Sequence, residues 1–142
     1  MSFQVAQQYL GRYRAAQMDM ARTERLIKKT RELLEVQGVD TSSERVQSSV
    51  TGDRTANLIA ELVDARHEFE EAFERSLQMM RDINTVIGLV HSPQQKRLLE
   101  LRYIEGKTWE EISNTIHVTY RHVFRVRNNA LAAVEEILCG DE

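Results

Sequence analysis

Hydrophobic residues recur in alternating steps of four and three along the segment from Arg54 to Val90. This spacing places them on one side of an α-helix and is typical of a coiled-coil seam. Charged residues fill most of the positions between them. The segment therefore predicts one helix, about 55 Å long, whose apolar side needs a partner. The predicted seam is Leu58, Leu62, Ala65, Phe69, Ala72, Ser76, Met79, Ile83, Val86 and Val90.

The N-terminal segment has the same alternation in a weaker form, so it is the expected partner helix. The segment between the two is rich in Ser, Thr, Gly and Asp and predicts a flexible loop over 38–53. Gly38 is expected to end the first helix and Asp53 to cap the second. Two long helices joined by a loop favour an antiparallel hairpin. The first seam is Tyr9, Tyr13, Ala16, Met20, Thr23, Ile27, Thr30 and Leu34, with Leu10, Leu26 and Leu33 expected to widen it.

Helix-start signals follow one another closely in the last third of the chain. Ser92 precedes Pro93, as an N-cap precedes a first helical position, and Thr108 with Glu111 matches a capping box. A three-residue turn then leads to Thr119, the expected cap of a helix that ends at about residue 138. Short helices and a tight turn before a longer helix fit a helix-turn-helix. The expected inward positions are Leu98, Leu101, Tyr103, Trp109, Ile112, Ile116, Val123, Val126, Ala130, Val134 and Ile137.

Charge is unevenly distributed in this chain of 142 residues and net charge -3. The segment from Ile112 to Val134 contains three arginines, two histidines and no acid. A helix that enters the DNA major groove lies between two rows of phosphates, where acids are repelled and arginines can donate to phosphates or guanine. The outward residues expected to contact DNA are Thr119, Tyr120, Arg121, His122, Phe124, Arg125 and Asn128, with Arg102 and Lys107 as phosphate contacts.

The stretch "LLELRYIEGKTWEEISNTIHVTYRHVFRVRNNAL", residues 98–131, resembles region 4 of bacterial sigma factors, which reads the promoter -35 element. The whole layout is similar to small bacteriophage and prophage transcription regulators with a sigma-like helix-turn-helix. The resemblance implies DNA contacts by Tyr120, Arg121, Phe124 and Arg125. Sigma factors usually carry charged or amide residues where Tyr120 and Phe124 stand, so the resemblance does not extend to the -35 sequence itself. Phe124 is expected to pack on a thymine methyl group or on the hairpin.

Composition narrows the remaining classes of protein. The single cysteine, Cys139, rules out an intramolecular disulfide and suits a reducing compartment. No apolar run is long enough to span a membrane, and no signal peptide is visible, so the bacterial host cytoplasm is the expected location. The histidines are scattered, so no metal or other cofactor is expected. No nucleophile triad, phosphate-binding loop or carboxylate pair is visible, and a non-enzyme is expected.

The sequence thus predicts an all-α protein with a long helical hairpin over 1–91 and a helix-turn-helix domain over 92–142. The expected function is sequence-specific binding of double-stranded DNA in transcriptional regulation of the phage or prophage type. The hairpin is expected to form a homodimer or to contact RNA polymerase. Two alternatives stay open: a DNA-packaging subunit like the phage small terminase, and a structural coiled-coil protein whose last helices only cap the bundle.

Overall fold

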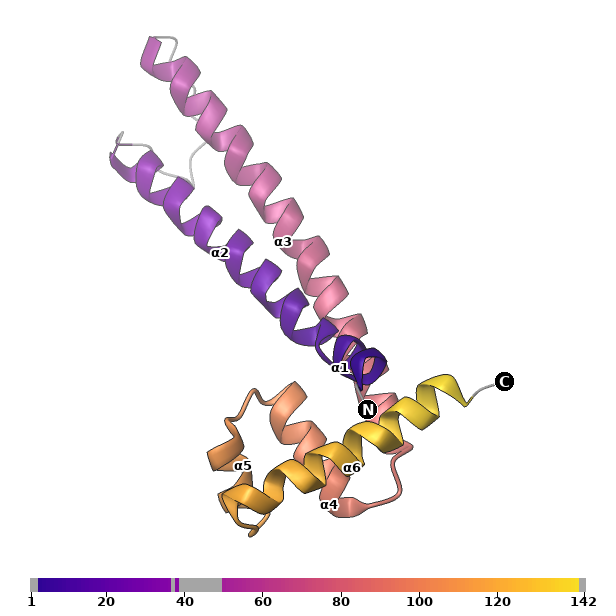
Figure 1. Ribbon diagram of the computed structural model, residues 1–142. Coiled ribbons are helices and arrows are strands. Elements are labelled where there is room, and N and C mark those ends of the chain that lie inside the picture. The colour runs from indigo at the N-terminus through magenta and orange to yellow at the C-terminus, as the bar shows by residue number, and fades with distance from the viewer. Residues whose placement is uncertain (1–2, 37, 39–49, 141–142) are drawn as a thin grey trace. The chain divides into compact units, whose positions relative to one another are not determined.

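The computed structural model describes residues 3–36, 38 and 50–140, which form helices joined by short turns, with no strand among them. The all-α class predicted from the sequence is therefore confirmed. The chain divides into two compact units: unit 1 comprises residues 1–16 and 76–142, and unit 2 comprises residues 17–75. The helices in chain order are α1 (Gln4–Leu10), α2 (Arg12–Val36), α3 (Val50–Gly88), α4 (Pro93–Leu99), a π-helical turn η1 (Glu100–Ile104), α5 (Trp109–Thr115) and α6 (Tyr120–Cys139) (Figure 1).

Unit 2 consists of the greater part of α2 and the first two-thirds of α3, which lie side by side and run in opposite directions (Figure 1). The predicted seam positions are buried or half-buried on both helices, and Leu34, Leu62 and Ala65 are among the most buried. Charged residues occupy the exposed positions around them. The seam is therefore covered by packing within one chain.

Two threonines lie in the buried seam of α2. The Oγ1 of Thr30 donates to the backbone carbonyl of Leu26 (2.8 Å), and the Oγ1 of Thr23 donates to that of Met20 (2.9 Å). Each hydroxyl is thus satisfied by its own helix, so its burial carries no unpaired polar group. The small threonine side chains remain compatible with an apolar seam.

Several predicted details of the long helices are wrong. Leu26 and Leu33 do not widen the seam, because 47% and 41% of their surfaces are exposed. The second helix begins at Val50, so Asp53 lies in its first turn instead of capping it. The first helix is interrupted at Gly11, whose amide still donates to the carbonyl of Gln7 (3.0 Å).

The predicted loop over 38–53 lies mostly outside the described residues. Its first residue, Gly38, has a positive φ of 72° and donates its amide to the carbonyl of Glu35 (2.9 Å). A left-handed residue after the last helical turn is the usual glycine-terminated helix end. The predicted role of Gly38 is therefore confirmed.

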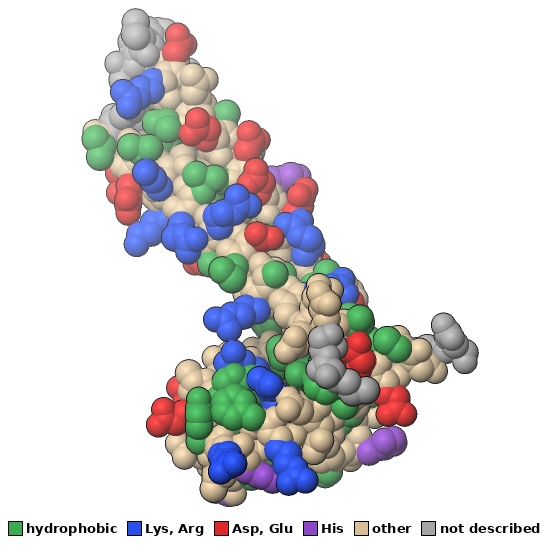
Figure 2. All heavy atoms as spheres, viewed as in Figure 1, with side chains coloured by type: hydrophobic (Ala, Val, Ile, Leu, Met, Phe, Trp, Pro, Cys, Tyr) green, Lys and Arg blue, Asp and Glu red, His purple; other side chains and the backbone are tan. Residues whose placement is uncertain are grey.

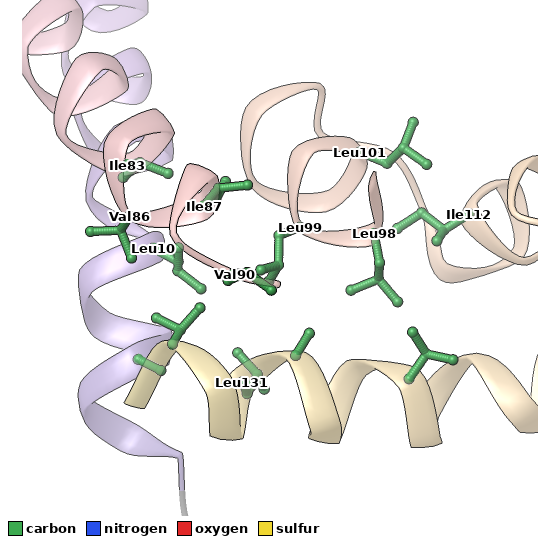
Figure 3. Close-up of a cluster of buried hydrophobic side chains, with 14 of the residues drawn as sticks. Leu10, Ile83, Val86, Ile87, Val90, Leu98, Leu99, Leu101, Ile112 and Leu131 are labelled. Atoms are coloured by element: carbon green, nitrogen blue, oxygen red, sulfur yellow. The ribbon is translucent and has the colours of Figure 1, made fainter. Parts of the chain in front are cut away.

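In unit 1, α6 packs against α1, α4 and α5. Their apolar faces meet in one core, in which side chains from the end of α3 and from α1 lie beside those of the C-terminal helices (Figure 3). This unit therefore takes in segments on both sides of residue 91, the boundary predicted from sequence. The core residues are Ala6, Leu10, Ile83, Val86, Ile87, Val90, Leu98, Leu99, Leu101, Ile112, Val123, Val126, Ala130, Leu131 and Val134.

Three side-chain caps fix the starts of the C-terminal helices. The hydroxyls of Ser92, Thr108 and Thr119 each accept the amide of the third residue beyond, at 3.3, 3.2 and 3.0 Å. These are the caps predicted from sequence, and each satisfies an amide that the helix itself leaves unpaired. The predicted helix after Pro93 differs in one respect: it changes to π-helical geometry at Glu100.

Candidate nucleic-acid interface

A short turn joins α5 to α6 and sets the start of the longer helix. The amide of Val118 donates to the carbonyl of Ser113 (3.0 Å), and His117 reverses the chain with a φ of 59°. Thr119 then takes an extended conformation and caps α6. The turn therefore ties the first residues of α6 to α5 within unit 1.

One row of residues along the first half of α6 faces solvent. Arg121, Arg125 and Asn128 are spaced by four and three residues, so they lie on one face of the helix, and all three are exposed. Val123 and Val126 on the opposite side are buried. Two further polar residues predicted as contacts at this end, Thr119 and His122, are also exposed. These five predicted residues form one continuous polar surface.

A second row of α6 lies on the side of α5 and contains Tyr120, Phe124 and Arg127. Phe124 and Arg127 are half-buried, while 57% of the Tyr120 surface is exposed. The ring of Phe124 lies 5.8 Å from that of Trp109, and the ring of Tyr120 meets Phe124 edge-on at 5.1 Å. Phe124 is half-buried and packs against the core. The prediction that it points outward is wrong, because α5 offers its ring an aromatic partner within the same unit.

Two guanidinium groups stack on the same aromatic group. The Cζ of Arg102 lies 4.6 Å from the centre of the Trp109 ring, and that of Arg127 lies 5.7 Å from it. Arg102 also donates through Nη1 to the carbonyl of Lys107 (3.0 Å). Cation–π contacts of this kind hold long side chains in place while their remaining N–H groups stay free to donate. We call Arg102, Trp109, Tyr120, Phe124 and Arg127 the aromatic–arginine cluster.

Arg127 was not among the predicted site residues. Its Nε and Nη2 donate to the Oδ1 of Asn128 at 3.2 and 2.9 Å. Arg127 therefore orients the side-chain amide of Asn128, which is one of the predicted DNA contacts. The sequence carries one signal for it, because Phe124 and Arg127 are three residues apart and therefore neighbours on a helix. What the sequence does not show is that Trp109 lies beside both.

Burial also affects the phenol of Tyr103, which packs beside these arginines. Desolvation raises the pKa of Tyr103, and the nearby positive charges of Arg102 and Arg127 lower it by a smaller amount. The phenol therefore stays neutral to a higher pH than an exposed tyrosine does, and it acts as part of the apolar support for the cluster.

The positive charges of this surface are unevenly neutralised. Arg97 makes ion pairs with Glu100 (3.5 Å) and Glu105 (3.1 Å). Within the described part of the chain, Lys107, Arg121 and Arg125 make no ion pair. On the face shown in Figure 2, basic side chains lie around a hydrophobic area of unit 1. The result is a local positive surface on a chain of net negative charge.

Other kinds of site find no support in the described residues. No group of three His, Cys, Asp or Glu side chains lies close enough to hold a metal ion, as far as the chain is described. No helix over the same residues is long and apolar enough to cross a membrane. Comparisons with protein-family models, with curated proteins and with solved structures find no match. The chemistry of the surface therefore carries the functional argument.

Proposed function

We propose that this protein is a sequence-specific DNA-binding transcription regulator of the phage or prophage type. In this proposal α5 and α6 form a helix-turn-helix with α6 as the recognition helix, and α2 and α3 form a helical hairpin. The observation that carries the proposal is the row Arg121, Arg125 and Asn128: exposed, adjacent, and on a helix with no acid before Glu135. That surface matches what a major groove requires.

The exposed row supplies the groups that read bases. Arginine can donate two hydrogen bonds to the O6 and N7 of guanine, and the amide nitrogen of asparagine can donate to the N7 of adenine. Arg121 and Arg125 are one helical turn apart, which suits neighbouring base pairs. The Oδ1 of Asn128 already accepts from Arg127, so the amide nitrogen is the group left to donate to a base, for example to the N7 of adenine.

The aromatic–arginine cluster has a supporting role in this proposal. Trp109 fixes the guanidinium groups of Arg102 and Arg127 at the edge of α6, where a phosphate row would pass. Held side chains lose less conformational entropy on binding than free ones. Exposed Lys107 adds a charge that can contact phosphate without reading sequence.

The regulatory role rests on the resemblance of residues 98–131 to sigma region 4. It makes RNA polymerase a candidate partner alongside DNA, with the surfaces of unit 2 left for a protein contact. The proposed activity needs no cofactor and no catalytic group, since recognition is by hydrogen bonds and charge alone.

The experiment that tests this function is selection of bound sequences from a random DNA pool by the full-length chain. The proposal predicts enrichment of one sequence motif, and binding of that motif that exceeds binding of scrambled DNA by about a thousandfold or more. A pool that stays random after repeated selection, with only weak, salt-sensitive binding of all sequences, would contradict it.

A further inference from the structure

A second apolar stripe runs along α3 beside the buried seam. Ile59, Val63 and Phe73 expose 39%, 59% and 44% of their surfaces. Each stands one residue after a seam position, so the three share a face about a quarter-turn from the seam. The same alternation of four and three continues through positions 59, 63, 66, 70 and 73. Arg66 and Glu70 therefore lie at the centre of the stripe.

The order of residues in this stripe is complementary to itself when reversed. In an antiparallel pair of α3 helices centred at position 68, Val63 of one chain lies opposite Phe73 of the other. Arg66 then lies opposite Glu70, and by symmetry Glu70 lies opposite Arg66. Ile59 lies opposite Leu77, which continues the alternation along the same helix. Every facing pair is apolar with apolar or basic with acidic.

The side chains in the centre of the stripe are available for such pairing. Arg66 and Glu70 are exposed, and in the described part of the chain neither makes an ion pair. Phe73 stacks on Phe69 with ring centres 6.5 Å apart, and these two rings line a hollow on α3 together with Glu70, Glu71 and Glu74. A small aliphatic knob such as Val63 of a second chain fits a hollow of this kind.

We propose that the protein forms a two-fold symmetric dimer through the stripe Ile59, Val63, Arg66, Glu70 and Phe73 of α3. Two-fold symmetry requires that a surface complement itself, and this stripe does. The buried seam is covered within the chain and leaves the stripe for the second copy. A lipid surface fits less well, because it would leave Arg66 and Glu70 without partners in an apolar layer.

Charge reversal tests the pairing directly, by sedimentation equilibrium of the full-length chain without DNA. The wild type is expected to dimerise. Arg66→Glu and Glu70→Arg each place two like-charged pairs in the interface, so each is expected to weaken dimerisation by on the order of tenfold or more. An equimolar mixture of the two variants restores both opposite-charge pairs, so it is expected to form a heterodimer about as strong as the wild-type dimer.

The matched control is Arg75→Glu, which reverses an exposed charge of the same helix away from the stripe. It is expected to dimerise like the wild type. Recovery in the mixture shows that both single variants are folded, so a folding defect cannot imitate the result. A wild-type chain that is monomeric at all concentrations would overturn the proposal. So would single reversals that dimerise normally, or a mixture that fails to recover. These measurements are made without DNA, so their outcome does not depend on the proposed DNA binding.

Discussion

The carboxylate of Glu135 on α6 accepts a hydrogen bond from the backbone amide of Ala6 on α1, at 2.8 Å. Ala6 lies in the first turn of α1, where helix amides have no partner within the helix and the helix dipole favours a negative charge. Glu135 therefore caps a helix that is distant in sequence. It joins the N-terminal helix to the helix proposed to read DNA.

Replacing Glu135 with alanine should loosen α1. The change removes a partly buried, charge-assisted hydrogen bond, so we expect the free energy of unfolding to fall by about 1–2 kcal/mol. Hydrogen exchange of the Ala6 amide should become faster in the same variant. Urea unfolding and exchange measured by NMR check the two effects.

The neighbouring residue supplies the control for this prediction. Glu136 is an exposed acid on the same helix, so Glu136→Ala should change stability by less than about 0.5 kcal/mol. Equal losses in the two variants would show that the hydrogen bond to Ala6 contributes nothing specific.

The turn before α6 depends on a residue with positive φ. His117 has a φ of 59°, a conformation that β-branched residues avoid strongly and that glycine adopts without strain. His117→Val should therefore lower the free energy of unfolding by about 1–2 kcal/mol, whereas His117→Gly should not lower it. The control is His122→Val at an exposed position inside α6, which should lower the free energy of unfolding by no more than about 0.5 kcal/mol. Thermal melts of the three variants would contradict this account if His117→Val were as stable as wild type.

Alkaline pH should destabilise unit 1 through its tyrosines. Burial raises the folded-state pKa of Tyr9 and Tyr103 above the ordinary value of 10.0, and Asp82 adds to the effect at Tyr9. The unfolded chain then releases these protons at a lower pH than the folded chain does. Stability should be fully present below about pH 10 and should fall as the pH rises through the folded-state pKa. In urea unfolding across this range, Tyr103→Phe should show a shallower fall; an unchanged slope would exclude Tyr103 as a cause.

Local signals in the sequence were sufficient for much of this fold. The caps at Ser92, Thr108 and Thr119 and the seam of α3 follow from hydrogen-bonding chemistry and helical period, which act within a few residues. Contacts between segments that are distant in the sequence could not be predicted from such local signals. The bond from Ala6 to Glu135 and the position of Trp109 beside Phe124 and Arg127 depend on how helices pack. For the same reason the sequence indicates an outward Phe124, and it offers only the three-residue spacing from Phe124 as a signal for Arg127.

The two-fold dimer proposed through α3 also bears on function. Two recognition helices related by two-fold symmetry would favour a DNA site with inverted halves. A packaging subunit of the small terminase type assembles as a ring instead, and a surface that complements itself closes after two copies. A sedimentation result with many subunits would therefore favour the packaging alternative over a regulator.

Gel shifts on the selected site at two salt concentrations test whether the exposed row of α6 reads DNA. Arg121→Ala and Arg125→Ala should each weaken binding by about 1–3 kcal/mol and relax the preference at one base pair. Lys107→Ala should weaken binding to all sequences alike and lower the salt slope by about one unit. Arg97→Ala removes an equal charge that is already paired with Glu100 and Glu105, so it should bind nearly as wild type does. If Arg121→Ala and Arg125→Ala bind the selected site as tightly as the wild type, α6 is not the recognition helix.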